Sequence, residues 1–214
     1  MPVRAVVFDV GETLVDETRA WAEWADWLGV PRLTLMAAIG AVIARGEHHR
    51  RAFDMVRPGI DLDAEITKRR AAGSLYHFAR ADLYPDAVPC LEALRTAGYR
   101  LAVGGNQPLD AELILQDLGL PFDVVATSAS MGTEKPFPEF FRHFARLLDL
   151  PPGEIAYVGD RLDNDVGPAK AADMVAVFLR RGPWGLIQSS PDKPTGAAIE
   201  IGSLLELPDR LARL

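Results

Sequence analysis

The chain has 214 residues, of which 49% are hydrophobic and 25% are charged, as expected of a globular protein with one core or one domain carrying an insert. Its formal net charge of −7 argues against non-specific nucleic-acid binding, although a bound metal ion would still allow a small anionic substrate. The single cysteine excludes an intramolecular disulfide and favours a reducing compartment. We expect a cytoplasmic protein without membrane partners, because no apolar run approaches the roughly 20 residues of a membrane span and the chain opens on no signal peptide.

The first predicted element is a buried strand that ends in a carboxylate. Residues 5–8 are apolar, and Asp9 follows them directly, with Gly11, Glu12 and Thr13 close behind. In open α/β sheets, ligands bind beyond the carboxyl ends of the strands, so Asp9 stands where a ligand is expected. The same residue types are common in ordinary turns, and the segment by itself could be only a strand-to-helix connection.

A long stretch with helical periodicity follows, over residues 16–84. Its tryptophans, beginning with Trp21 and Trp24, could line a ligand pocket or could form the core of a small helical unit. The basic cluster at residues 48–51 could be a solvated helix face or a surface that faces a phosphate.

From residue 85 onward, strands and helices alternate. The predicted strands are 99–103, 123–126, 155–158 and 175–179, and the predicted helices are 88–98, 108–118, 137–147 and 165–172. Such alternation is typical of a parallel, doubly wound sheet. We therefore predict an α/β protein whose Rossmann-like core comprises residues 1–15 and 85–214, with residues 16–84 as an inserted, all-helical cap.

The end of the chain gives two weaker predictions. Residues 182–196 are rich in Gly, Pro and Ser and are predicted to form a surface loop. Ser203 and Glu206 have the spacing of a capping box that opens the last helix.

A second acidic turn follows the predicted strand 155–158. It carries Asp160, Asp163 and Asp165 within six residues. If this strand lies beside the first one in a parallel sheet, these carboxylates and Asp9 form an oxygen-rich pocket suited to a hard divalent cation.

Four segments together resemble the haloacid dehalogenase superfamily of hydrolases. Its first motif, D-x-D-x-T, resembles residues 9–13, and its second, a Ser or Thr followed by Asn, resembles Gly105–Asn106. The third, a Lys often followed by Pro, resembles Lys135–Pro136, and the fourth, G-D-x-x-x-x-D, is matched by Gly159, Asp160 and Asp165. The motifs stand in the family's order over the whole chain, and the helical insert lies where the family has its helical cap.

The resemblance implies a Mg²⁺-dependent phosphatase that acts on a small phosphorylated metabolite. Asp9 is then the nucleophile that forms an aspartyl-phosphate, Lys135 neutralises phosphoryl charge, and Asn106 orients the nucleophile or the phosphoryl oxygens. The implied Mg²⁺ ligands are Asp9, the carbonyl of Gly11, Asp160 and Asp165.

Two residues depart from the family pattern. Gly11 replaces the second aspartate, which in the family's phosphatases protonates the leaving group and later activates water. Glu12 is one position out of register, although a flexible turn could reorient it. Gly105 lacks the usual hydroxyl and keeps only its backbone N–H. The expected phosphatase is therefore slow on poor leaving groups.

Other functions remain open from the sequence. The chain could be a catalytically weak or non-catalytic metal-binding regulatory protein of the same fold, or a metal-free dehalogenase. A metal-free site is disfavoured because Asp160 and Asp165 would place uncompensated charge beside Asp9. A receiver-like phosphorylation module also combines acids with a lysine, but the motif order and the insert disfavour it. The sequence does not predict the substrate, the oligomeric state or the role of the segment Arg180–Gly185. This segment could be an exposed loop with Trp184 as its anchor, or it could hold a substrate group or a partner chain.

Overall fold

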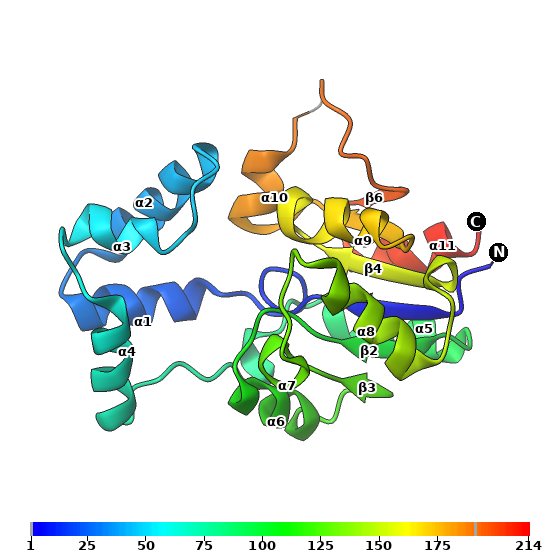
Figure 1. Cartoon of the computed structure of the whole chain (residues 1–214), viewed down its shortest axis with the longest axis horizontal. Coiled ribbons are helices and arrows are strands. Elements are labelled where there is room, and N and C mark those ends of the chain that lie inside the picture. The colour runs from blue at the N-terminus through cyan, green and yellow to red at the C-terminus, as the bar shows by residue number, and fades with distance from the viewer. Residues whose placement is uncertain (1, 191) are drawn as a thin grey trace. The chain divides into compact units, whose positions relative to one another are not determined.

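The structure is a computed structural model that describes residues 2–190 and 192–214. The chain forms two compact units: a sheet unit, Met1–Asp16 with Ala79–Leu214, and a helical unit, Glu17–Phe78. Figure 1 shows the chain with its elements labelled. Each unit is described by itself below.

The sheet unit contains one six-stranded sheet in the order β3-β2-β1-β4-β5-β6, and every pairing in it is parallel. Its strands are β1 (Ala5–Phe8), β2 (Arg100–Val103), β3 (Val124–Val125), β4 (Ile155–Gly159), β5 (Val175–Leu179) and β6 (Ile199–Ile201). All residues of β1 and β4 are buried. Burial on both faces explains why these strands are continuous apolar runs rather than alternating patterns.

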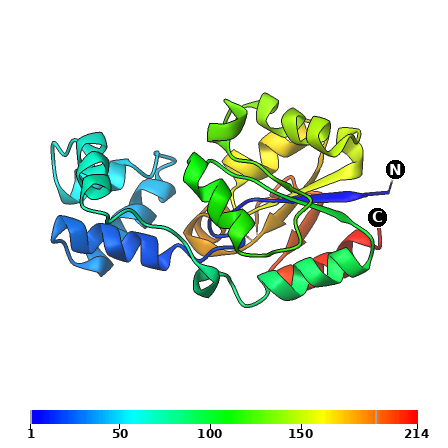
Figure 2. The ribbon, with the colours of Figure 1, turned by 90° about the horizontal axis from the view of Figure 1, so that it is seen from below.

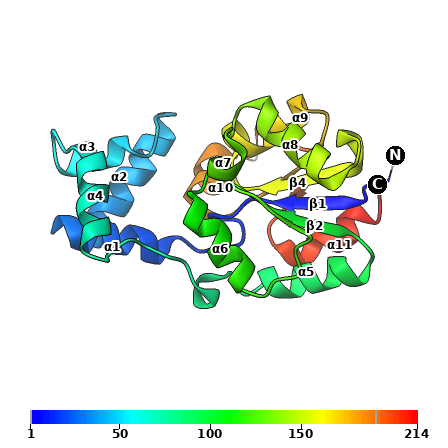
Figure 3. The same ribbon diagram turned by 60° about the horizontal axis from the view of Figure 1, so that its bottom comes forward.

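Helices cover both faces of this sheet. They are α5 (Ala87–Thr96), α6 (Leu109–Asp117), α7 (Ser128–Met131), α8 (Pro138–Leu148), α9 (Gly167–Ala171), α10 (Gly182–Gln188) and α11 (Leu207–Leu211). Short 3₁₀ turns occur at Arg80–Asp82, Pro152–Glu154 and Leu204–Glu206, and a π-helical turn spans Leu162–Val166. Figure 2 and Figure 3 show α8 and α9 on one face, and α5 and α11 on the other. The predicted doubly wound α/β fold is confirmed.

An aromatic cluster fills the core between α8 and the sheet. Phe140, Phe141 and Phe144 lie on the buried side of α8, and all are fully buried. Phe141 packs edge-on against Tyr157 of β4, with ring centroids 4.9 Å apart. Phe140 contacts both of its aromatic neighbours on α8, which fixes the helix against the sheet.

The helical unit consists of α1 (Thr18–Leu28), α2 (Arg32–Ala44), α3 (Arg51–Val56) and α4 (Leu62–Ala71). Trp24 packs edge-on against Phe53 at a centroid distance of 5.0 Å. The guanidinium carbon of the buried Arg69 lies over the Trp24 ring, 4.3 Å from its centroid. These contacts place Trp24 in the unit's own core. In the basic cluster, Arg50 and Arg51 form exposed ion pairs with acidic neighbours, as on a solvated face.

Among the described residues, no single helix is long and apolar enough to cross a membrane. The helices Thr18–Leu28 and Arg32–Ala44 satisfy such a test only as a pair, and they are bent by 116° at their break.

Two segments near the end of the chain differ from expectation. The predicted surface loop begins as a helix instead, because Gly182–Gln188 forms α10, with Pro183 in its first turn and Trp184 buried. Strand β6 was not predicted. The capping box is confirmed: Ser203 Oγ accepts from Leu205 N, and Glu206 Oε1 accepts from Ser203 N at 3.0 Å.

Candidate active site

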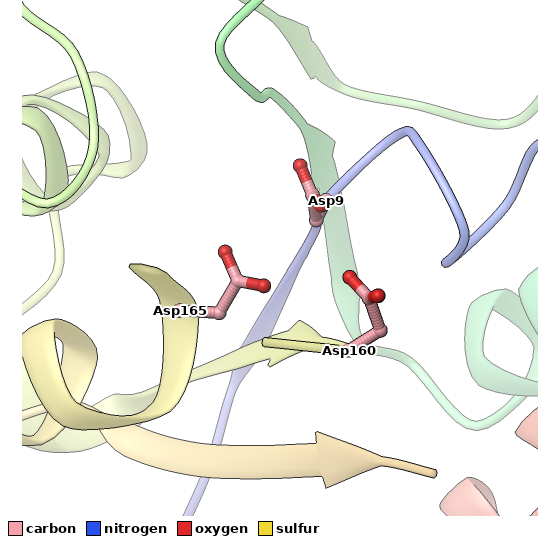
Figure 4. A group of neighbouring side chains, drawn as sticks. All are labelled: Asp9, Asp160 and Asp165. Atoms are coloured by element: carbon pink, nitrogen blue, oxygen red, sulfur yellow. The ribbon is translucent and has the colours of Figure 1, made fainter. Parts of the chain in front are cut away.

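Three carboxylates meet at the carboxyl end of the two central strands. Asp9 follows β1, Asp160 follows β4, and Asp165 lies on the π-helical turn after it. One oxygen from each lies within 4.8 Å of the others, and all three residues are buried. Figure 4 shows how these side chains converge from their separate elements.

The sheet register explains why the first and fourth motifs meet. Phe8 pairs with Val158, and the Asp9 N–H continues the ladder by donating to Val158 O at 2.9 Å. Gly159 leaves the space that the neighbouring acid needs, because a Cβ there would overlap the Asp165 carboxylate. The backbone N–H of Arg161 donates to Asp165 Oδ2 at 3.0 Å and fixes that carboxylate.

Lys135 supplies the positive charge of the cluster. It comes from the loop between α7 and α8, is 3% exposed, and donates from Nζ to Asp9 Oδ1 at 2.7 Å and to Asp165 Oδ1 at 2.6 Å. Burial alone lowers the pKa of this ammonium group, but the charges of Asp165 and Asp9 outweigh it and hold the pKa well above its ordinary value.

The remaining acid has the properties of a cation ligand. Asp160 Oδ2 is buried and accepts no hydrogen bond from any residue that the structure describes. Burial, followed by the charges of Asp165 and Asp9, raises the pKa of the Asp160 carboxyl well above its ordinary value. Burial likewise raises the pKa of Asp165 to about 6. An all-oxygen donor set with a buried, unsatisfied carboxylate oxygen fits Mg²⁺. The charge of the ion would offset the repulsion among the three buried carboxylates.

Asn106 links the second and third motifs. Its Nδ2 donates to Lys135 O at 2.8 Å, and its Oδ1 accepts from Lys135 N at 2.8 Å. The Asn106 amide therefore binds the backbone of Lys135, and it is connected to Asp9 only through this lysine.

Gly105 lies directly against the carboxylate of Asp9. A Cβ on Gly105 would lie 2.5 Å from Asp9 Oδ1. The carboxylate thus occupies the space that the missing side chain leaves. Gly11 lies in the tight turn after Asp9, which is closed by a 2.7 Å hydrogen bond from Glu12 N to Val15 O.

Glu12 is anchored to Tyr84. The Tyr84 hydroxyl donates to Glu12 Oε2 at 2.6 Å, and Glu12 has a positive φ of 54°. Gly182 closes over this side chain, because a Cβ on Gly182 would lie 2.5 Å from Glu12 Oε2. Burial and the hydrogen bond to Glu12 raise the pKa of Tyr84. The turn therefore directs Glu12 to Tyr84.

Arg181 is a supporting residue that sequence reasoning did not identify. Its guanidinium donates to Thr13 O at 3.0 Å, forms an ion pair with Asp86, and lies 4.1 Å from the centroid of the Tyr84 ring. No motif spacing signals these contacts, because they join segments that are distant in the chain. They give Arg181, which directly precedes α10, a structural role beside the turn that follows β1.

Asp163 takes part in a separate network beside the cluster. It forms an ion pair with Arg161 at 2.8 Å, and Gln188 Nε2 donates to it at 2.9 Å. Asp163 therefore stabilises the turn of the fourth motif through Arg161 and Gln188, and it is not part of the cluster of Asp9, Asp160 and Asp165.

The chain was compared with known proteins. The family model of the haloacid dehalogenase-like hydrolases matches residues 3–173. Glyceraldehyde 3-phosphate phosphatase of Methanopyrus kandleri is 35% identical over 200 residues, which cover 85% of this chain and 86% of that protein. A crystal structure described as a predicted phosphoglycolate phosphatase from Haemophilus somnus has a TM-score of 0.71 at 22% identity, with 98% of each chain covered. The 2-haloacid dehalogenase of Pseudomonas syringae has a TM-score of 0.60 at 23% identity, with 99% of each chain covered.

The likeness to the last two structures concerns the fold, which phosphatases and dehalogenases share. The family model extends over more than half of the sequence and includes all four motifs. The chain belongs to the haloacid dehalogenase-like hydrolases.

Proposed function

We propose that this hydrolase is a Mg²⁺-dependent phosphatase of a small phosphorylated metabolite, with Asp9 as the nucleophile. The observation that carries the proposal is the contact of Lys135 Nζ with Asp9 Oδ1, at 2.7 Å, inside a group of three buried carboxylates. A nucleophilic carboxylate beside a fixed cation and a metal-binding set is what transfer of an anionic phosphoryl group needs. The similarity to glyceraldehyde 3-phosphate phosphatase supports the same reaction.

The proposed Mg²⁺ ligands are Asp9, the Gly11 carbonyl, Asp160 and Asp165. When bound, the ion would neutralise charge on the phosphoryl oxygens and on the carboxylates around it. It would also offset the mutual repulsion of the buried carboxylates.

The chain's own residues carry the chemical steps. An oxygen of Asp9 attacks phosphorus, the bond from phosphorus to the substrate oxygen breaks, and an aspartyl-phosphate forms on Asp9. Lys135 stays protonated and balances the charge of the transferred group. Water then attacks phosphorus, inorganic phosphate leaves, and the Asp9 carboxylate is restored. Gly11 brings no acid to the leaving group, so the departing oxygen takes its proton from water or leaves as the anion.

The test is hydrolysis of an activated aryl phosphate by the full chain, with Mg²⁺ and with a chelator. We expect Mg²⁺-dependent turnover that Asp9→Asn abolishes, because an amide is a poor nucleophile and a weaker ligand. Asp163→Asn is the matched control, since Asp163 lies in the same acidic turn but pairs with Arg161 instead.

Three other outcomes would overturn the proposal. Turnover that survives in Asp9→Asn would exclude the covalent step. Halide release from a 2-haloacid without any metal would indicate a dehalogenase. Mg²⁺ binding without turnover of any phosphorylated metabolite would indicate a regulatory protein.

A further inference from the structure

Tyr157 lies on β4, beside the strand that precedes the proposed nucleophile Asp9. Val7 of β1 pairs in register with Tyr157 of β4 on one side and with Ala102 of β2 on the other. Residues paired in a parallel sheet point to the same face, so these three side chains share the face that α8 covers. Ala102 is small, and this leaves room for the Tyr157 ring to extend across β1 toward the end of β2.

The Tyr157 hydroxyl reaches the turn that follows β2. It donates to Gly104 O at 3.1 Å, and Tyr157 is only 1% exposed. Gly104 is packed so closely that a Cβ there would overlap the Phe144 ring and the Ala126 carbonyl oxygen. The hydrogen bond and this packing together fix the first peptide of the turn.

The turn Gly104–Asn106 is also held by backbone hydrogen bonds, among them those that Gly105 O accepts from Gln107 N at 2.9 Å and from Ser128 N at 3.1 Å. Gly105 brings no side chain, so at this position the turn offers only backbone groups to an anionic substrate. Its N-terminal end is tied to β1 through Gly104 N, which donates to Phe8 O at 2.9 Å. Its C-terminal end is tied to Lys135 through the paired amide contacts of Asn106. Two adjacent glycines are intrinsically the most flexible pair of residues, and the Tyr157 hydroxyl holds the first of them.

The same ring also contacts the catalytic cation. Lys135 Nζ lies 5.6 Å from the centroid of the Tyr157 ring, within the range of a cation–π interaction. One buried side chain thus touches both groups that face the Asp9 carboxylate, the lysine and the glycine turn.

We propose that Tyr157 is a positioning residue for phosphoryl transfer, which fixes the turn Gly104–Asn106 and Lys135 against Asp9. In this chain, the phenol hydroxyl supplies rigidity to a turn that has lost its own hydroxyl side chain at Gly105. The inference rests on the proposed phosphatase activity, since it concerns the groups that surround the transferred phosphoryl.

The test is Tyr157→Phe, which removes one hydroxyl and keeps the ring in the core. We expect kcat on an aryl phosphate to fall about 5- to 20-fold, with KM little changed, because the turn is displaced from the transition-state oxygens. Inhibition by orthovanadate should weaken by a similar factor. The affinity for Mg²⁺, measured by calorimetry, should stay within about twofold, because its proposed ligands lie after β1 and after β4. Tyr99→Phe makes the same chemical change just before β2, at the opposite end of that strand from the site, and is the control.

Amide hydrogen exchange gives a readout that does not depend on activity. In Tyr157→Phe the backbone of residues 104–106 should exchange faster than in the wild type, while β1 and β4 should not. Wild-type kcat and unchanged exchange in Tyr157→Phe would overturn the inference. If the wild type hydrolyses no phosphate ester, the proposed function fails, and the exchange measurement still decides whether the hydroxyl fixes the turn.

Discussion

Gly11 and Glu12 together determine whether the leaving group of the proposed reaction is protonated by a side chain. Gly11 has no side chain, and the Glu12 carboxylate accepts a 2.6 Å hydrogen bond from Tyr84. General acid–base catalysis is typically worth about 10²–10⁴-fold in rate. Its absence matters most for basic alkoxide leaving groups and least for aryl oxides. The wild type should therefore favour aryl phosphates over sugar phosphates.

Gly11→Asp should selectively raise the rate of hydrolysis of alkyl phosphates and so reduce the preference for aryl phosphates. The positive φ of the turn, 54°, falls on Glu12 rather than on Gly11, so the substitution does not require a left-handed aspartate. Steady-state rates on a matched aryl and alkyl pair provide the measurement, after thermal melting has shown that the variant folds. Gly11→Asn controls for side-chain size. If Gly11→Asp binds Mg²⁺ but gains nothing on alkyl substrates, the missing acid does not limit the enzyme.

Among single residues, the sequence predicted best the positions of those that directly follow a strand. Asp9 and Asp160 converge because parallel strands bring their carboxyl ends to one edge of the sheet, and Lys135 reaches them from the loop between α7 and α8. The partners of Glu12 and Asn106 could not be predicted, since they depend on side-chain directions within two turns.

Helix α10 begins directly against the first turn, and this makes its first glycine sensitive to substitution. Gly182 has a φ of 62°, and a Cβ there would lie 2.5 Å from Glu12 Oε2. Gly182→Ala should therefore lower the free energy of unfolding by about 2–4 kcal/mol, through backbone strain and overpacking.

Gly196→Ala is the matched control for that variant. Gly196 also has a positive φ, 78°, but the nearest atom to its Cβ would be Lys170 Nζ at 3.9 Å. Gly196→Ala should lower the free energy of unfolding through backbone strain alone, by about 1–2 kcal/mol. Urea denaturation of both variants measures the difference, and equal losses would show that the contact with Glu12 does not matter.

The same helix shows where prediction of elements failed. The segment after residue 182 has the composition of a loop, yet Pro183 stands in the first turn of α10 and Trp184 is buried. A helix of seven residues has too few turns for a clear apolar periodicity. Longer elements such as α8, with phenylalanines along one side, were predicted because their periodicity is unambiguous.

Across the sheet unit, Asp86 ties together three segments that are far apart in the chain. Its Oδ2 accepts from Arg181, from Ser203 Oγ at 2.6 Å and from Leu204 N at 3.0 Å. Burial alone raises the pKa of Asp86, but hydrogen bonds from Arg181 and Ser203 outweigh it, and the net effect is a lowered pKa. Because the pKa is lower in the folded state, ionised Asp86 stabilises the protein at pH values above the ordinary aspartate pKa of about 3.9. This stabilisation is lost as the pH falls through the folded-state pKa.

Asp86→Asn should therefore destabilise the protein by about 1.5–3 kcal/mol at neutral pH, and the difference from the wild type should shrink below about pH 4. Urea unfolding between pH 6 and pH 3 measures it, with the exposed Asp117→Asn as the control for net charge. A difference that stays constant down to pH 3 would show that the ionised form of Asp86 contributes nothing.

The central place of β1 has a consequence for how the protein is made. Strand β1 is synthesised before both of its neighbours, because β2 and β4 begin only at Arg100 and Ile155. We expect the helical unit to gain its local contacts early, while the apolar residues of β1 await their partners, exposed to nascent-chain chaperones. Asp9 is thus synthesised well before Lys135 and Asp160, and the proposed active site is complete only once these later residues have folded against it.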